Sequence, residues 1–200
     1  MTDSSDITYD LSLLEKSMSA WKKSPGLRDY YASLYRDMAD EGIGARPLEI
    51  GSGIAASREF LPRLTTSDIV KTPYVDRAVS AYDIPLPEAG NVWTSILALD
   101  VFHHMREPLR FIESASRALE PGGKIILMEP CASVFGRCFY SLFHVEPMER
   151  KSIEPPCSFE PNGPDSSYAN MAIAYELVNR HREWFNLQLS QYGLKLSKVG

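Results

Sequence analysis

The sequence predicts an α/β fold: a mostly parallel, doubly wound sheet with helices on both faces, which makes a three-layer sandwich. Short runs that are apolar along their whole length alternate with segments whose apolar residues recur every three or four positions. One such run ends in two closely spaced glycines before a helical pattern begins, which is typical of the ligand-binding loop of these sheets. The length of 200 residues suits a single domain, residues 1–200, with a sizeable core.

The first 45 residues are expected to form an N-terminal helical cap. Residues 10–41 have helical periodicity, and Gly42 and Gly44 end the pattern. The apolar stripe on this segment consists of Leu27, Tyr30, Tyr31, Leu34, Tyr35 and Met38.

The central segment, residues 46–130, is expected to alternate strands and helices. The expected strands are residues 46–50, 66–70, 78–82 and 92–99, and a turn at 120–123 leads into a fifth apolar strand. The expected helices are residues 55–64 and 108–119.

The pattern changes after Pro130. Residues 134–143 are rich in aromatic side chains and are predicted to be helical, whereas residues 145–167 contain several prolines and no periodicity. Long loops in compact domains are often lids, so we expect residues 131–170 to form a lid or substrate loop. A helix at residues 172–191 and a strand at residues 194–199 are expected to complete the C-terminal part, residues 171–200.

Composition and charge exclude several function classes. The net charge is −5 and no long basic run is present, so nucleic acid is not expected as a partner. No apolar stretch approaches the roughly 18 residues that a membrane span requires. Residues 1–10 lack the layout of a signal peptide, and we expect a cytoplasmic location.

The three cysteines do not form a recognisable framework. An odd count without a C-x-x-C pair argues against disulfides and against a zinc site, and no other metal site is predicted. The sequence contains Cys131, Cys138 and Cys157, and we interpret Cys131 and Cys138, which are seven residues apart, as two small buried apolar side chains.

The segment "LEIGSGIAASREF", residues 48–60, carries the strongest functional signal. Gly51 and Gly53 lack a Cβ, so the backbone can turn sharply and a ligand can approach it closely. The following helix presents free N–H groups. Asp68, about 17 residues after Gly51, is expected at the end of the second strand, where its carboxylate can accept hydrogen bonds from both hydroxyls of a ribose.

Two cofactors fit this pattern. A nicotinamide dinucleotide fits the relaxed glycine fingerprint of Gly51, Gly53 and Ala56. Glu49 argues against it, because its carboxylate would repel a pyrophosphate, whereas a sulfonium ligand with an ammonium group suits an acidic site. The glycine-loop strand also begins only near residue 46, after two expected helices, whereas a dinucleotide fingerprint usually opens its domain.

Five features in chain order resemble the motifs of class I S-adenosylmethionine-dependent methyltransferases that act on small molecules. They are "EIGSG" (49–53), Asp68, "SAYDIPLP" (80–87), "LALDVFHHM" (97–105) and "LEPGGKIILMEP" (119–130). The resemblance covers roughly residues 46–130. It implies a Rossmann-like fold, S-adenosyl-L-methionine as cofactor and S-adenosyl-L-homocysteine as product.

The same resemblance implies a set of cofactor-binding residues. It assigns Asp68 to the ribose, Asp83 and Ile84 to the adenine, and the segment 97–105 to the methionine side and the substrate cavity. The implied residues are Glu49, Gly51, Ser52, Gly53, Asp68, Ile69, Asp83, Ile84 and Leu99.

Two departures from the family pattern stand out. Ala55 occupies a position where the family often has a third glycine, and the expected seventh strand is missing after "LKLSKVG". Three explanations stay open: the chain is truncated, a sixth strand pairs directly with the fifth in the order 3-2-1-4-5-6, or a second copy fills the gap in a homodimer.

The expected reaction is methyl transfer by in-line displacement, driven mainly by proximity, to a small-molecule acceptor. If the acceptor must lose a proton, the candidate bases are His104 and His103 after the fourth strand. Each histidine has an alternative structural role, and so has His144 in the expected lid. Aromatic residues that either line a substrate pocket or pack in the core are Tyr30, Tyr31, Tyr35, Phe135, Phe139, Tyr140 and Phe143.

Two other functions remain open at this stage. One is a NAD(P)-dependent oxidoreductase, in which pyrophosphate would contact Gly51 and Gly53. The other is a non-catalytic methyltransferase-like module that serves binding or assembly.

Overall fold

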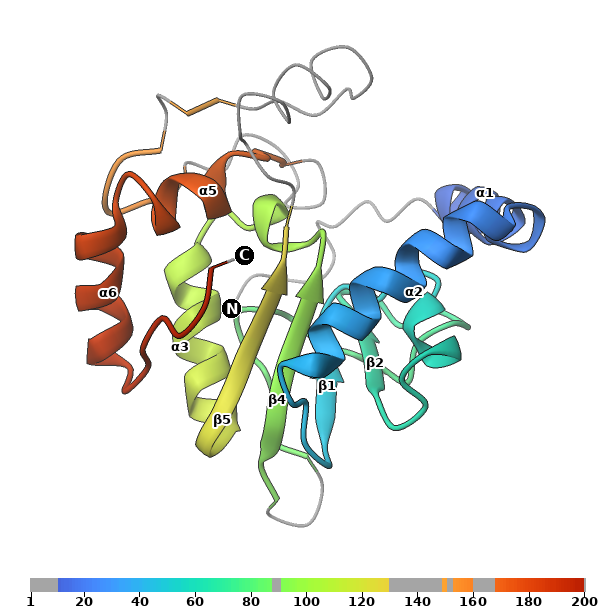
Figure 1. The fold of residues 1–200 in the computed structure, drawn as a ribbon, viewed down its shortest axis with the longest axis horizontal. Helices are drawn as coiled ribbons and strands as arrows, with labels where there is room; N and C mark the ends of the chain where they lie inside the picture. The colour runs from blue at the N-terminus through green and yellow to red at the C-terminus, as the bar shows by residue number, and fades with distance from the viewer. Residues whose placement is uncertain (1–10, 88–90, 130–148, 151–152, 160–167, 200) are drawn as a thin grey trace. The chain divides into compact units, whose positions relative to one another are not determined.

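The computed structural model describes residues 11–87, 91–129, 149–150, 153–159 and 168–199. Figure 1 draws these residues as a coloured ribbon. They belong to two compact units. The first, which we call the sheet unit, comprises Thr8–Leu99 and Arg117–Met128, and the second, the C-terminal unit, comprises Asp100–Ser116 and Glu129–Gly200.

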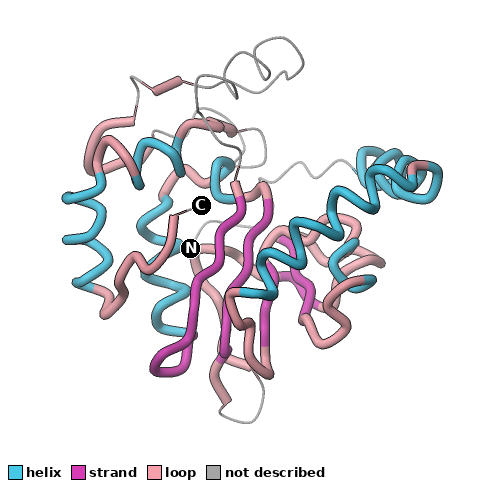
Figure 2. Tube along the Cα trace, in the orientation of Figure 1, coloured by secondary structure: helices cyan, strands magenta, loops and turns pink. Residues whose placement is uncertain are grey.

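The sheet unit contains five strands in the order β3-β2-β1-β4-β5, and every neighbouring pair is parallel. Figure 2 shows these strands side by side. The parallel α/β sheet predicted from the sequence is confirmed. The strands are β1 (Pro47–Glu49), β2 (Thr65–Asp68), β3 (Arg77–Ala78), β4 (Trp93–Leu99) and β5 (Leu119–Met128).

The centre of the sheet is formed by β1 and β4, which the sequence marks as continuous apolar runs. All seven residues of β4 are buried, and so are all three of β1. In register, Glu49 pairs with Leu97 and with Thr66, and Leu99 pairs with Met128. Glu49, Leu99 and Met128 are the last residues of their strands, so these three strands end at the same edge of the sheet.

Two helices precede β1, as predicted: α1 (Leu11–Lys23) and α2 (Pro25–Asp40). The helix α2 begins where Ser24 accepts a hydrogen bond from the Leu27 amide and where Pro25 supplies a preset φ. Its apolar stripe packs on the sheet. The buried cluster on this face consists of Tyr35, Met38, Leu64, Leu97, Leu99 and Ile126.

Among its described residues, the C-terminal unit contains a 3-10 helix and three α-helices. They are η4 (Phe102–His104), α3 (Pro108–Ala118, of which residues 108–116 belong to this unit), α5 (Ile173–Val178) and α6 (Arg182–Gln191). The Phe102 and Phe111 rings meet edge to face with centroids 6.0 Å apart. The helix α5 contacts η4, and the Asn170 amide donates to the His103 carbonyl at 2.8 Å.

The predicted helix at residues 55–64 is wrong. Only one 3-10 turn, η2 (Ala56–Glu59), forms there. It follows Ala55, whose φ of 53° is left-handed and incompatible with a regular helix, and Pro62 prevents the turn from continuing as a helix. The predicted strand at 78–82 is also shorter than expected, because Ser80 and Asp83 form an isolated antiparallel bridge.

Two C-terminal predictions are corrected. The expected helix at 172–191 is broken at residues 179–181, where the Asn179 side chain donates to the Tyr175 carbonyl and the His181 ring contacts the Ile153 carbonyl. The expected strand at residues 194–199 does not form, because its alternating pattern finds no ladder partner. Among the described residues the sheet order therefore ends at β5, without a sixth strand.

The described parts of the predicted loop, residues 149–150 and 153–159, contain no helix or strand, as expected. Cys157 is a free thiol and is buried. The helix predicted at 134–143 and the rest of the loop lie mainly outside the described residues. So do Cys131, Cys138, His144, Phe135, Phe139, Tyr140 and Phe143.

Candidate functional site

The glycine loop follows β1 and has an unusual backbone. Gly51, Gly53 and Ala55 have φ angles of 69°, 53° and 53°, so three alternate residues adopt the left-handed conformation. The Ser52 amide donates to the Ser67 carbonyl at 2.8 Å, which holds the loop against β2. The two glycines adopt this conformation without strain, whereas Ala55 pays a steric cost.

Asp68 links the end of β2 to this loop. Its Oδ2 accepts a hydrogen bond from the Gly53 amide at 2.9 Å, and its Oδ1 accepts one from the Ile69 amide at 2.7 Å. The side chain is thereby fixed beside the glycine loop at the carboxyl end of the strand. Each carboxylate oxygen has more than one acceptor site, so the donors that a ribose offers match the chemistry of this group.

Glu49 lies at the end of β1 and is 1% exposed. Its Oε1 accepts a hydrogen bond from the Tyr35 hydroxyl at 2.8 Å, and its Oε2 accepts one from the Ser57 hydroxyl at 2.6 Å. Burial raises the pKa of this carboxyl above its ordinary value of 4.5, against the effect of the hydroxyl donors. In the structure, Glu49 connects α2 to η2, and its contact with a cofactor stays a prediction.

The remaining predicted residues occupy separate positions in the sheet unit. Asp83 is exposed, and its amide donates to the Ser80 carbonyl at 3.1 Å. Ile84 and Leu99 are 7% and 8% exposed, and Ile69 is half-buried. Hydrogen bonds therefore connect Glu49 to Ser52 and Gly53 to Asp68 around the loop, and Asp83 lies apart from this group.

The histidines predicted as bases lie in the C-terminal unit. His103 is 3% exposed, and its Nδ1 lies 2.7 Å from Oε2 of Glu129. His104 is half-buried, and its Nδ1 lies 2.8 Å from the Tyr168 carbonyl oxygen. The two imidazole rings are 4.2 Å apart between centroids.

Glu129 is a site residue that the sequence analysis missed. It directly follows β5, and its carboxylate accepts hydrogen bonds from the amides of Val101, Phe102 and His103. A signal was available in the sequence, because Glu129, like Glu49, is a carboxylate that follows an apolar run predicted to be a buried strand.

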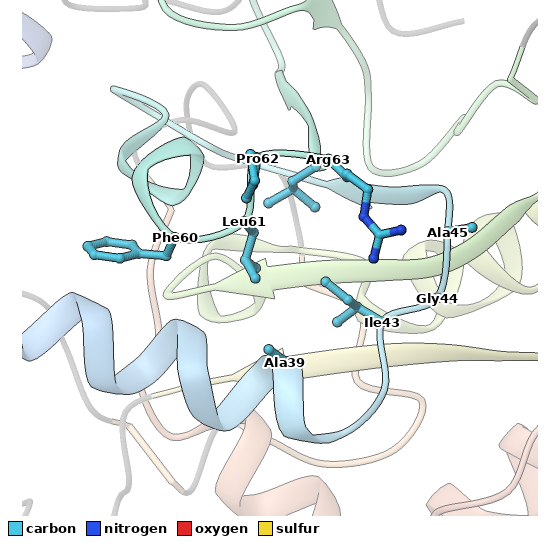
Figure 3. A pocket seen from close by; sticks show the side chains of 9 residues that line it. Ala39, Ile43, Gly44, Ala45, Phe60, Leu61, Pro62 and Arg63 are labelled. Atoms are coloured by element: carbon cyan, nitrogen blue, oxygen red, sulfur yellow. The ribbon is translucent and has the colours of Figure 1, made fainter.

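A cavity of about 620 Å³ lies in the sheet unit at a different place. Its lining comes from residues just before β1 and just before β2, so it is at the amino ends of these strands. Figure 3 shows the Arg63 side chain extending toward the segment of Ile43, Gly44 and Ala45. Open parallel sheets bind ligands at the carboxyl ends of their strands, so this cavity is separate from the glycine loop.

Within the described part of the chain, no group of three or more histidine, cysteine or acidic side chains is arranged to hold a metal ion. None of the described helices combines the length and the apolar character that crossing a membrane requires.

The comparison with protein families decides the assignment. Residues 23–195 match the family model described as "Methyltransferase domain". The chain belongs to this family. The family predicted from the five motifs is confirmed, and the match favours methyl transfer over the nicotinamide alternative.

Comparisons with curated proteins and with solved structures give less specific information about this methyltransferase domain. No curated protein matches it. Among solved structures, it is similar to the [4+2]-cyclase SpnF, with 22% identity, a TM-score of 0.40 and coverage of 48% of this chain and 44% of the cyclase. It is also similar to the N-methyltransferase NodS from Bradyrhizobium japonicum WM9 in complex with S-adenosyl-l-homocysteine, with 14% identity, a TM-score of 0.45 and coverage of 64% and 76%.

A third similar structure is the CMeT domain of the citrinin polyketide synthase, with 22% identity, a TM-score of 0.38 and coverage of 50% of this chain and 32% of that one. The methyltransferase domain thus spans less than half the length of the cyclase and of the polyketide synthase domain.

Proposed function

We propose that this methyltransferase domain transfers a methyl group from S-adenosyl-L-methionine to a small-molecule acceptor. The observation that carries the proposal is the pairing of Asp68 with the Gly53 amide at 2.9 Å. This pairing puts a carboxylate beside a left-handed glycine loop at the carboxyl ends of adjacent parallel strands, where such sheets bind nucleosides.

In this proposal, Asp68 holds the ribose hydroxyls, and Gly51, Ser52 and Gly53 let the cofactor approach the backbone. Ile69 and Ile84 supply apolar contacts, Asp83 binds the adenine, and Leu99 lies on the methionine side. When bound, the cofactor supplies a methyl group attached to a positively charged sulfur. The acceptor attacks the methyl carbon in line with the carbon–sulfur bond, and the sulfur leaves. The domain contributes mainly by holding the two reactants in position, an effect that reaches about 7–11 kcal/mol in favourable systems.

Glu49 has two roles to distinguish. Its carboxylate could attract the ammonium group of the cofactor, as the motif implies. The hydrogen bonds from Tyr35 and Ser57 support a different role, which we call the bracing role. In this role, Glu49 stabilises the loop by connecting α2 to η2. We favour the bracing role, because both carboxylate oxygens are buried and engaged within the sheet unit.

A small-molecule acceptor is favoured over nucleic acid because the net charge is −5 and no basic run is present to bind phosphates. The cytoplasmic location and the homodimer stay predictions. Sedimentation equilibrium of the purified chain tests the homodimer.

Calorimetric titration with S-adenosylhomocysteine, with NADH run in parallel, tests the proposed cofactor. We expect binding of the nucleoside in the micromolar range and no heat from NADH. Binding of NADH alone would contradict the proposal. Absence of binding for both ligands would support a non-catalytic module in its place.

A further inference from the structure

The cavity at the amino ends of β1 and β2 combines apolar walls with a single charged side chain. Its volume of about 620 Å³ lies within the range of pockets that hold small molecules. Nine residues line it, all in the described part of the chain, and Arg63 is the one among them that is ionisable. The larger apolar side chains of the lining are Ile43, Phe60, Leu61 and Leu64.

The apolar walls belong to the core of the sheet unit. Ile43, Phe60 and Leu61 pack against the buried cluster that contains Leu64 and Tyr35. The Phe60 ring stacks on the Tyr35 ring with centroids 5.7 Å apart. Core packing therefore holds these walls, and they present a preformed apolar surface to a ligand.

The wall formed by Ile43, Gly44 and Ala45 offers hydrogen-bond donors. The Ile43 carbonyl is already engaged, because it accepts hydrogen bonds from the hydroxyls of Thr94 and Ser95 at 3.0 and 2.6 Å. The Gly44 and Ala45 amides, in contrast, donate to no acceptor among the described residues, and both residues are exposed. This wall can thus donate to a ligand that supplies acceptors.

Arg63 adds a positive charge to these donors. Its side chain extends toward residues 43–45 (Figure 3), and it pairs with no carboxylate or other acceptor in the described part of the chain. A guanidinium has N–H donors and no acceptor, and its planar fork matches the two oxygens of a carboxylate. The polar side of the cavity therefore suits an anion.

We propose that this cavity binds a small amphipathic carboxylate, whose carboxylate pairs with Arg63 and whose hydrocarbon chain lies against Phe60 and Leu61. One guanidinium balances one negative charge, which favours a carboxylate over a doubly charged phosphate. The apolar walls favour a ligand that carries a hydrocarbon chain over a free inorganic anion. The site is independent of the proposed function, because the cavity is separate from the glycine loop.

Calorimetric titration of the full chain with sodium octanoate tests this site, with octan-1-ol and inorganic phosphate as comparison ligands. We expect saturable binding of one octanoate, about tenfold or more tighter than octan-1-ol, because the alcohol lacks the charge-assisted hydrogen bonds. Phosphate should also bind at least about tenfold more weakly than octanoate, because it leaves the apolar walls uncovered.

Two variants locate the binding. Arg63→Gln should weaken octanoate binding about tenfold or more and leave octan-1-ol binding unchanged. Figure 3 shows the Ala39 side chain pointing toward Leu61, so Ala39→Leu should fill part of the apolar space and weaken both ligands. Arg36→Gln, at an exposed arginine of α2 outside the cavity lining, is the matched control and should change neither affinity.

Equal affinities for octanoate and octan-1-ol, or an unchanged octanoate affinity in folded Arg63→Gln, would overturn the proposal. Saturation with S-adenosylhomocysteine should leave octanoate binding unchanged, whereas competition would place octanoate at the glycine loop and contradict the cavity site. Octanoate binding that depends on Arg63 in a protein that does not bind S-adenosylhomocysteine would support the cavity site while the proposed function fails.

Discussion

The carboxylate of Asp68 accepts a hydrogen bond from the backbone amide of Gly53, 15 residues earlier in the chain, at 2.9 Å. This bond ties the loop after β1 to the end of β2. Gly53 has a left-handed φ, and in this conformation its amide points at the Asp68 carboxylate. In the nucleoside site that we propose, this bond fixes the carboxylate beside the glycine loop.

The strain in this loop is concentrated at Ala55, and we expect Ala55→Gly to stabilise the domain. An alanine with φ of 53° costs about 1–2 kcal/mol relative to glycine, and the extra freedom of glycine in the unfolded chain offsets part of this gain. The predicted increase in the free energy of unfolding is about 0.5–1 kcal/mol, measured by urea denaturation.

The control for this prediction is Ala32→Gly within α2, which makes the same chemical change in a regular helix. It should destabilise the domain by about 0.5–1 kcal/mol. Equal effects of the two substitutions would show that the left-handed backbone of Ala55 is not strained.

Gly44 has a different constraint, because a side chain there would collide with β4. A Cβ at Gly44 would lie 2.6 Å from Cβ of Thr94, and φ is 69°. The Thr94 hydroxyl also donates to the Ile43 carbonyl and accepts from the Arg46 amide. Gly44→Ala should lower the free energy of unfolding by about 2–4 kcal/mol.

Gly122→Ala is the control for Gly44→Ala. It introduces the same backbone strain without a steric collision. Gly122 has φ of 82°, and no atom lies within 4 Å of its added Cβ. We expect it to cost about 1 kcal/mol, so urea denaturation should show a clearly larger loss for Gly44→Ala. Comparable losses would contradict the steric argument.

The buried Glu49 should make stability depend on pH. A carboxyl whose pKa is raised on folding favours its protonated form in the folded state. Its contribution is therefore fully present below pH 4.5 and is lost as the pH rises through the folded-state pKa. As the pH rises above 5, we expect the wild-type free energy of unfolding to fall relative to that of Glu49→Gln.

A second carboxyl that could affect the pH profile is Asp76, whose pKa is lowered rather than raised. Burial opposes ionisation of Asp76, but hydrogen bonds from Thr66 and the charge of Arg58 outweigh it and lower the pKa. Its stabilisation is lost only as the pH falls below the ordinary carboxyl range, so measurements above pH 5 exclude it. Parallel pH profiles for wild type and Glu49→Gln would contradict the role assigned to Glu49.

Cys157 should be unreactive in the folded protein. Burial, with the nearby charge of Glu154, raises the pKa of this thiol to about 11, so only about one thiolate in ten thousand exists at pH 7. In a Cys131→Ser/Cys138→Ser variant, we expect negligible reaction with Ellman's reagent until denaturant is added. Rapid reaction of the folded variant would show that Cys157 is accessible.

The parts of the fold predicted correctly are those in which local pattern and topology agree. The apolar run before Gly51, the position of Asp68 and the continuous apolar β4 all follow from short-range sequence features. The helix predicted after Gly53 failed because Ala55 adopts a left-handed backbone, which the sequence pattern does not show.

The parts that were missed depend on partners distant in the chain. Glu129 lies 26 residues from His103, and neither residue alone indicates the pairing. Residues 194–199 have the alternation of a strand, but a strand exists only where a neighbouring strand offers its amides and carbonyls. Such partners are set by tertiary structure rather than by local propensity.

The affinity of S-adenosylhomocysteine for Asp68→Asn, compared with wild type, tests the central claim most directly. Asparagine keeps the size of the side chain but loses its charge, and Asp37→Asn makes the same change at an exposed position of α2. Hydrogen bonds to a charged group contribute about 1.5–3 kcal/mol, so calorimetry should show about 10–100-fold weaker binding for Asp68→Asn alone. Equal affinity of both variants and wild type would contradict the assignment of Asp68 to the ribose and, with it, the nucleoside site at the glycine loop.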